Sequence, residues 1–132
     1  SFRPERVWFL MADSMAVATA SAYPHDWVLP HGSTLHYVAV CPAHQGKRLG
    51  HWVSLLAMHQ MVREGMRFAG LATDDFRLPA IRTYLRLGFG PYLVHENQRE
   101  RWPRVFCELG MPELSARFAN LLEGEIHSLP KR

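Results

Sequence analysis

The most constraining stretch of the chain is Val38–Gly50, VAVCPAHQGKRLG, in which an apolar run meets a proline and then a turn with two glycines and two cations. A strand that ends here delivers the chain into a helix, whose free N–H groups and positive dipole end face one point. Lys47 and Arg48 add charge at this end, where cations are unfavourable unless an anion relieves them. Phosphates bind at such helix N-termini. The sequence therefore predicts an anion held by this turn.

The chain on either side of the turn has the pattern of a strand and a helix. Thr34–Cys41 is apolar and β-branched and is ended by Pro42, which predicts a strand. The apolar spacing predicts a helix over Gly46–Glu64, with Gly65 at the position of a C-terminal cap. Its apolar residues form two stripes, Leu49, Trp52, Val53 and Leu56 in one and Leu55, Met58 and Val62 in the other. Such a helix is expected to be covered on much of its surface, as when it packs across a sheet.

The rest of the chain has the pattern of an α/β protein without internal repeats. A hairpin comes first, and a loop marked by prolines joins it to the strand described above. In chain order, the expected elements are strands at Val7–Ala12 and Met15–Tyr23, a loop at Pro24–Ser33, a strand at Arg67–Asp74, a short helix at Leu78–Leu87, a final strand pair at Gly90–Glu96 and Arg104–Leu109, and an amphipathic helix at about 112–129. This order predicts a single domain over residues 1–132, with a mixed sheet and helices on its faces.

Composition agrees with one domain and narrows its partners. A chain of 132 residues with 48% hydrophobic content can bury a single core, and a charged fraction of 20% excludes a highly charged disordered tail. The net charge of +3 is spread along the chain, which fits a small polyanionic ligand better than extensive binding to duplex nucleic acid. No run reaches the length of a membrane span, and no signal peptide is visible. We therefore expect a cytoplasmic protein with no membrane contact.

The cysteines and histidines match no metal or redox motif. Cys41 and Cys107 lack C-x-x-C spacing, so two free thiols in a reducing cytosol are expected. Four of the eight histidines lie close together in sequence, but their spacings fit no zinc pattern and no H-E-x-x-H occurs. We expect no bound metal.

Two segments carry a resemblance to a known family. VCPAHQGKRLG resembles the pyrophosphate-binding motif of the GNAT superfamily of acyl-CoA-dependent N-acetyltransferases, written Q/R-x-x-G-x-G/A. RLPAIRTYLRLGF resembles the N-x-x-A-x-x-L-Y-x-K-x-G-F signature of the same family. The matching residues are Gln45 and Gly50 in the first motif and Ala80, Tyr84, Gly88 and Phe89 in the second; Arg48 takes the place of the central glycine, and Arg77, Thr83 and Arg86 replace the asparagine, leucine and lysine. The motifs occur in the family's order, and the resemblance covers about Val7 to Phe106.

The resemblance implies a GNAT-type mixed sheet, flanked by helices, in which two central parallel strands splay apart. It also implies the acyl donor acetyl-CoA, with the coenzyme A pyrophosphate on the glycine-bearing turn and the pantetheine arm along the end of the preceding strand. The residues implied for cofactor binding are Val38, Ala39 and Val40 in the strand, Gln45, Gly46, Lys47, Arg48, Leu49 and Gly50 in the turn, and Arg77 and Ala80 in the second motif. Arg48 either crowds this turn or forks onto a phosphate. Family members usually have a strand and one or two helices before the hairpin, elements that the six residues before Val7 do not provide.

The implied reaction is transfer of an acetyl group to a primary amine by direct attack. Tyr84 matches the family's general acid, since a phenol of pKa about 10 can protonate a departing thiolate whose conjugate acid has a pKa of about 8.5; a tyrosine that only packs its ring is the alternative. His36 is the candidate base, unless it merely faces solvent. Asp74, Asp75 and water are further candidates for the base, although helix capping also explains the two aspartates. No covalent intermediate is needed, so neither cysteine has to act as a nucleophile.

Two other interpretations belong to different functional classes. The domain could bind coenzyme A without transferring the acyl group and serve as a regulatory or interaction module, which the departure at Arg48 favours. Asn97–Arg104, NQRERWPR, could instead hold single-stranded nucleic acid by its arginines and tryptophan, although a solvated hairpin loop is the simpler interpretation. The acceptor itself, a small-molecule or peptide amine, is not named by the sequence. The C-terminal amphipathic helix is available to dock on a second copy in a homodimer.

Overall fold

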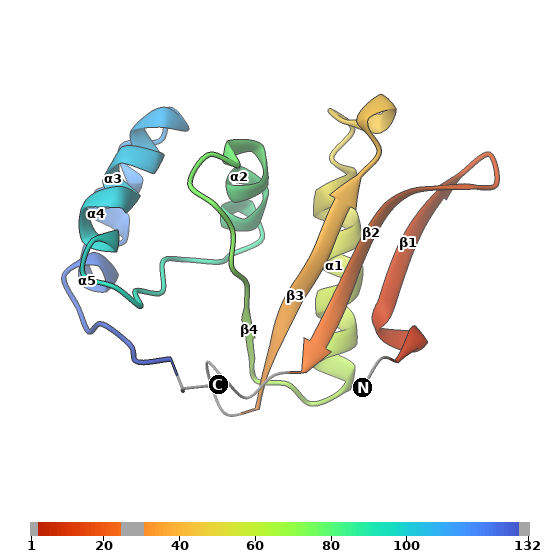
Figure 1. The fold of residues 1–132 in the computed structure, drawn as a ribbon, viewed down its shortest axis with the longest axis horizontal. Coiled ribbons are helices and arrows are strands. Elements are labelled where there is room, and N and C mark those ends of the chain that lie inside the picture. Colours follow the sequence, from red (N-terminus) through yellow and green to blue (C-terminus); the bar gives the residue numbers. More distant parts are fainter. Residues whose placement is uncertain (1–2, 25–30, 130–132) are drawn as a thin grey trace. The chain divides into compact units, whose positions relative to one another are not determined.

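A computed structural model describes residues 3–24 and 31–129 of the chain. It divides into two compact units, Ser1–Ala72 and Thr73–Arg132. The first unit contains a sheet and one long helix, and the second contains four shorter helices (Figure 1). This division does not test whether residues 1–132 form a single domain, so that expectation stays a prediction. Most of the loop expected at Pro24–Ser33 lies outside the described residues.

The first unit is a four-stranded mixed sheet with a helix along it. The strands are β1 (Val7–Ala12), β2 (Met15–Pro24), β3 (Gly32–Val40) and β4 (Phe68–Gly70), in the spatial order β1-β2-β3-β4. The first two pairs are antiparallel, and β3 and β4 are parallel. The helix α1 (Leu49–Arg63) packs mainly on β2 and β3 (Figure 1). This architecture confirms the mixed α/β sheet predicted from the sequence.

Small side chains allow α1 to lie close to the sheet. Alternate residues of β2, Ala18, Ala20 and Ala22, are buried, and Val53 and Ala57 are fully buried on α1. An alanine-rich strand is a weak strand signal by propensity, but here its short side chains form one buried face. At the hairpin turn both Asp13 and Ser14 have positive φ, at 49° and 67°, which is the conformation of a two-residue turn that matches strand twist.

The other side of α1 is more exposed than its two apolar stripes predict. The buried residues of α1 are Val53, Ser54, Ala57 and Met61. Trp52 is 51% exposed and Val62 is 72% exposed. The expectation that this helix is covered on much of its surface is therefore wrong for part of each stripe, because a helix on one sheet buries one face only.

The second unit is helical where the sequence suggested a final pair of strands. Its helices are α2 (Leu78–Arg86), α3 (Gln98–Glu108), α4 (Leu114–Arg117) and α5 (Ala119–Leu122). The predicted strands at Gly90–Glu96 and Arg104–Leu109 are wrong: the first segment has no regular structure, and most of the second belongs to α3. Trp102, Val105, Phe106 and Leu109 recur at helical spacing and pack in the core of this unit.

The C-terminal amphipathic segment is two four-residue helices and not one long helix. The chain breaks at Phe118, whose φ of −101° and ψ of 17° lie outside the helical region. Leu114 and Leu122 are buried with Phe106, and Phe118 packs against them. Most of the apolar side of this segment thus serves the unit's own core, while Leu121 is 47% exposed. The homodimer stays a prediction.

Cys41 and Cys107 are both free and exposed. Among the described residues no helix combines the length and apolarity needed to cross a bilayer.

Candidate active site

In the first unit, the parallel strands β3 and β4 share only a short ladder. Their pairs are Gly32–Phe68, Ser33–Ala69 and Thr34–Gly70. Beyond these pairs β3 continues to Val40, while β4 ends at Gly70 and the strand predicted to reach Asp74 stops there. The second half of β3 is paired with β2 on one side, and in the described part of the chain it has no strand on the other. The splay implied by the resemblance is therefore present, and it leaves an open edge that includes the predicted residues Val38, Ala39 and Val40.

A β-bulge lies in the open half of β3. The register with β2 shifts between Thr19 and Ser21, and Tyr37 has a φ of 50°. The Ser21 hydroxyl donates a hydrogen bond of 2.9 Å to the carbonyl of His36 beside it. An extra residue of this kind bends a strand and turns neighbouring groups. Sequence reasoning missed the bulge, because a tyrosine gives no signal for a left-handed conformation.

The turn between β3 and α1 brings the remaining predicted groups of the first unit together. After a short 3-10 turn at Pro42–His44, α1 begins at Leu49 with Arg48 as its N-cap. No side chain caps this end, and no acidic residue lies in the first helical turn. Lys47 Nζ lies 3.4 Å from His44 Nδ1, and both Lys47 and Arg48 are exposed. The turn thus presents unpaired helix N–H groups and two cations to solvent, the arrangement that favours an anion.

Two residues of this turn adopt left-handed conformations. Gly46 has a φ of 85° at no steric cost, whereas Arg48 has φ 59° and ψ 25°. For a residue with a side chain, this conformation costs about 1–2 kcal/mol. Gly50 is different, because a Cβ added there would meet only Val40 Cγ2 at 3.6 Å, an ordinary contact. The protein itself therefore has space for a methyl group at Gly50.

In the second unit, Tyr84 lies on α2 and is half-buried. Its ring meets the ring of Phe89 edge to face, with centroids 6.2 Å apart. Burial raises the pKa of the Tyr84 phenol above its usual value, and the charge of Arg77 acts in the opposite direction. The phenol is thus protonated at neutral pH. Arg77 is the N-cap of the same helix, and the predicted residue Ala80 lies one turn along it.

The three side chains that are candidates for the base have different surroundings. His36 is exposed on β3, with its ring centroid 3.9 Å from that of Tyr37. Asp74 forms an ion pair of 3.2 Å with Arg77. Both carboxylate oxygens of Asp75 accept hydrogen bonds from Arg101, at 2.7 and 2.9 Å. The two aspartates are therefore already paired with arginines, which leaves His36 and water as the better candidates.

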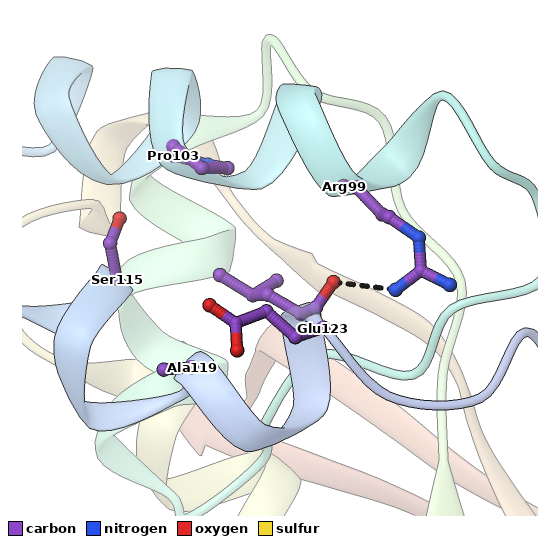
Figure 2. A pocket seen from close by; sticks show the side chains of 6 residues that line it. Arg99, Pro103, Ser115, Ala119 and Glu123 are labelled. Atoms are coloured by element: carbon purple, nitrogen blue, oxygen red, sulfur yellow. Dashed lines mark hydrogen bonds between the residues drawn. The ribbon is translucent and has the colours of Figure 1, made fainter.

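A hollow of about 470 Å³ in the second unit contains none of the predicted site residues. It lies between α3 and the two C-terminal helices and is lined by Arg99, Pro103, Ser115, Ala119, Leu122 and Glu123 (Figure 2). The Arg99 guanidinium crosses it to donate a 2.7 Å hydrogen bond to the carbonyl of Leu122 (Figure 2). Its cation is thus already engaged within the unit, and the candidate site lies elsewhere.

The acetyltransferase (GNAT) family profile matches residues 1–89, about two thirds of the chain. The chain belongs to the GNAT acetyltransferase family. It is 34% identical over 71 residues to a mycothiol acetyltransferase of Gordonia bronchialis, a match that covers 52% of the chain and 23% of that protein. A mycothiol acetyltransferase of Mycobacteroides abscessus is 33% identical over 83 residues, which cover 59% of the chain and 28% of that protein. The chain thus spans about a quarter of the length of these curated relatives.

Solved structures of GNAT proteins share the fold. The aminoglycoside N-acetyltransferase AAC(6')-Iy in complex with CoA has a TM-score of 0.59 and 21% identity, with 64% of this chain and 67% of that one covered. The ribosomal-protein-S18-alanine N-acetyltransferase of Escherichia coli has a TM-score of 0.54 and 24% identity, with coverages of 67% and 56%. These similarities confirm the GNAT-type fold predicted from the two motifs.

The conformation of Arg48 can be compared with the residue type that the GNAT motif has at this position. The GNAT motif has a glycine at this position, and the left-handed φ of 59° is a conformation that glycine adopts freely. Arg48 thus has, at the position of the motif glycine, a backbone conformation that a glycine would adopt without steric cost.

Proposed function

We propose that this GNAT chain transfers an acetyl group from acetyl-CoA to a primary amine. One observation carries the proposal: an open strand edge on β3 is followed, after a single short turn, by an uncapped, cationic helix N-terminus. Free strand N–H and C=O groups suit the amide-bearing pantetheine arm, which adds to the edge as a further strand would. Helix N–H groups and cations suit the pyrophosphate. CoA in the complex of AAC(6')-Iy supports the same donor for this fold.

The proposed residue roles follow the two GNAT motifs. Val38, Ala39 and Val40 supply the strand edge for the arm. The six residues Gln45–Gly50 form the phosphate turn, with Lys47 and Arg48 as its cations. Arg77 and Ala80 begin the helix that carries the general acid. These assignments rest on the motif positions and on the local geometry of each unit.

The proposed chemistry needs two proton transfers and no covalent enzyme intermediate. The amine lone pair attacks the thioester carbonyl, a C–N bond forms, and collapse of the tetrahedral adduct breaks the C–S bond. Tyr84 gives its phenolic proton to the departing sulfur, and His36 or water removes a proton from the nitrogen, which becomes positively charged as the C–N bond forms. We place this reaction in the cytoplasm, where both exposed thiols would stay reduced.

The first experiment tests binding at the turn by isothermal calorimetry with coenzyme A. Gly50→Ala places a methyl group in a space that the fold tolerates, and Gly50→Leu fills it. Both changes are expected to weaken binding, Gly50→Leu by more, because the added side chain occupies the space between the phosphates and the first helical turn. Val62→Ala, at an exposed position near the other end of α1, is the matched control. Unchanged affinity in a folded Gly50→Leu protein would contradict the proposed site.

The second experiment tests turnover. Free thiol released from acetyl-CoA is measured with a panel of amines, beginning with the acceptor classes in the names of two solved neighbours: an aminoglycoside and a peptide with an N-terminal alanine. Acetyl transfer to any of them supports the proposed acetyltransferase activity. Tight coenzyme A binding without transfer to any amine would favour the binding-module alternative instead.

A further inference from the structure

Three aromatic side chains, Tyr23, His36 and Tyr37, form an exposed aromatic cluster on β2 and β3 of the first unit. The ring centroids of His36 and Tyr37 lie 3.9 Å apart with an interplanar angle of 62°, and those of Tyr23 and His36 lie 6.4 Å apart. Tyr37 is 77% exposed and Tyr23 is 45% exposed, and His36 is exposed as well. The rings of this cluster are thus accessible from solvent and contribute little to the core.

The aromatic cluster and α1 lie on opposite faces of the sheet. The buried alanines of β2 face α1, since Ala18 pairs with Val40, whose Cγ2 borders the first turn of α1. Because successive side chains of a strand point to opposite faces, Ser21 and Tyr23 point to the other side. Ser21 pairs with His36, which places His36 on that side as well.

Tyr37 is held in the aromatic cluster by an unfavourable backbone conformation. Its φ of 50° lies in the left-handed region, which costs a residue with a side chain about 1–2 kcal/mol. The hydrogen bond from the Ser21 hydroxyl to the carbonyl of His36 fixes the strand beside it. Strain of this kind persists where the surrounding structure imposes it, and it gathers at functional sites. Because the Tyr37 ring is exposed, the strain does not serve core packing, which points to a role for the ring at the surface.

With the acyl donor placed as proposed above, the aromatic cluster lies beside the reacting end of the donor. The phosphate turn follows the end of β3, so the pantetheine arm runs back along Val40, Ala39 and Val38. Its thioester end then lies toward Tyr37 and His36. An amine acceptor is positively charged until it loses a proton, so its ammonium group arrives next to these rings.

The carboxylates in the described part of the first unit are ion-paired or distant from the aromatic cluster. Glu64 accepts a hydrogen bond of 2.6 Å from Arg6, and a carboxylate oxygen of Glu5 lies 3.8 Å from Arg3. Asp13 lies in the hairpin turn, at the opposite end of β2 from the cluster. The π faces of the rings carry negative partial charge, so they are the groups available here to attract an ammonium.

We propose that Tyr37, together with Tyr23, binds the ammonium group of the acceptor by cation–π attraction. A tyrosine face attracts a cation that lies within about 6 Å of the ring centroid. An ammonium held over Tyr37 lies next to His36, the candidate base, because the two rings are 3.9 Å apart. The acceptor class is therefore a primary amine whose charge is recognised by aromatic faces and not by an ion pair. The proposal rests on the function proposed above and assigns the acceptor end of the same site.

The first test measures binding and needs neither acetyl-CoA nor an acceptor. Choline is the probe, because its quaternary ammonium has no N–H to donate and is bound by ring faces. Its neutral isostere, 3,3-dimethylbutan-1-ol, has the same shape without the charge. Both are titrated into protein with ¹³C-labelled tyrosine, in which Tyr37→Phe and Tyr23→Phe assign the two signals among the four tyrosines. Choline is expected to shift both signals and to bind more tightly than the isostere.

Variants show whether the ring of Tyr37 is responsible. Tyr37→Leu keeps an apolar side chain but removes the ring, so it is expected to weaken choline binding by roughly two- to fivefold, measured on the Tyr23 signal. Tyr37→Phe keeps the ring and should keep the affinity. The matched control is Tyr92→Leu, which removes a tyrosine that is stacked on His127 in the second unit, with centroids 4.0 Å apart. Equal affinity for choline and its isostere, or an unchanged choline affinity in folded Tyr37→Leu, would overturn the proposal.

Turnover separates this proposal from the general function. With an amine that the assay above shows to be acetylated, Tyr37→Leu is expected to raise the KM for the amine while coenzyme A affinity stays unchanged, and Tyr37→Phe should restore the KM. Acetyl transfer with a KM that Tyr37→Leu does not alter would leave the proposed function standing and refute the role of the ring. Choline binding at the two tyrosines in a chain that acetylates no amine would refute the proposed function and leave an ammonium-binding site.

Discussion

The two units of the chain differ in what they contribute to the candidate site. The first unit offers backbone groups, an open strand edge and a helix N-terminus, and most of its candidate side chains are exposed. The second unit offers one half-buried phenol, whose surroundings alter its acidity. Backbone N–H and C=O groups tolerate the replacement of the motif glycine by Arg48, because every residue here carries them and Arg48 adopts a left-handed φ that is open to glycine. A general acid has no such tolerance, since its chemistry resides in one side-chain atom.

The largest expected effect is on the chemical rate, and it concerns the second unit. Tyr84→Phe keeps the ring and its contact with Phe89 but removes the proton. Loss of a positioned acid should lower the chemical rate by roughly 10²–10⁴-fold, with little change in coenzyme A affinity. Single-turnover kinetics and calorimetry measure the two quantities. If Tyr84→Phe turns over at the wild-type rate while the chemical step is rate-limiting, Tyr84 is a packing residue. The contrast between backbone groups in the first unit and an essential side chain in the second would then be wrong.

The next effect is on stability. Phe106 is fully buried in the core of the second unit, so Phe106→Ala is expected to cost about 3–5 kcal/mol in the free energy of unfolding. If residues 1–132 form one domain, amides of β2 should lose protection from hydrogen exchange together with those of α3. Urea unfolding and exchange mass spectrometry would show this, with Val62→Ala as an exposed control. Protection kept in β2 while α3 opens would mean two domains.

A smaller effect of predictable sign comes from Arg48. Arg48→Gly removes a left-handed strain of about 1–2 kcal/mol and adds a glycine entropy cost of about 0.5–1 kcal/mol, so a net gain in stability of at most about 1.5 kcal/mol is expected. If the guanidinium contacts a phosphate, coenzyme A affinity should fall although stability rises. Thermal unfolding and calorimetry on the same variant test both. Tighter binding by Arg48→Gly would mean that the arginine crowds the turn.

The sequence predicted the first unit better than the second for a physical reason. Strand runs, prolines and glycines mark β1 to α1 locally, and the alternation of alanines in β2 reports its buried face. The splay of β3 from β4 was implied by the motif, but the bulge at Tyr37 depends on pairing with a distant strand. In the second unit, a short apolar run at Arg104–Leu109 has no strand or helix preference of its own, and Phe106 becomes helical by packing against Leu93 and Leu114.

The pairing of Asp74 and Asp75 was also beyond the sequence. Helix capping explained both aspartates equally well. The sequence around them does not show which arginine each aspartate pairs with. Arg101 is 26 residues from Asp75, and the hydrogen bonds between them exist only because α3 forms where strands were expected. The formation of α3 therefore explains why Asp75 is paired, and this pairing makes Asp75 a weaker candidate for the base.

The smallest effect expected concerns this Asp75–Arg101 pair. Hydrogen bonds from Arg101 hold the pKa of Asp75 below its usual value, although burial opposes them. Because the folded pKa is the lower one, the pair stabilises the fold above the unfolded pKa, and this stability is lost as pH falls through the folded pKa. Both side chains are partly exposed and screened by solvent, so the contribution of the pair to stability is small.

Urea unfolding at neutral pH should show Asp75→Asn slightly less stable than wild type, and the difference should vanish once the pH falls below the folded pKa of Asp75, where the carboxyl is protonated in both states. Arg101→Gln should lose a similar amount of stability, and the double variant should be no less stable than either single variant. Acetyl transfer should stay near the wild-type rate, because a carboxylate held by two arginine hydrogen bonds is a poor base. A rate loss in Asp75→Asn as large as that in Tyr84→Phe would instead make Asp75 the general base and exclude His36 from that role.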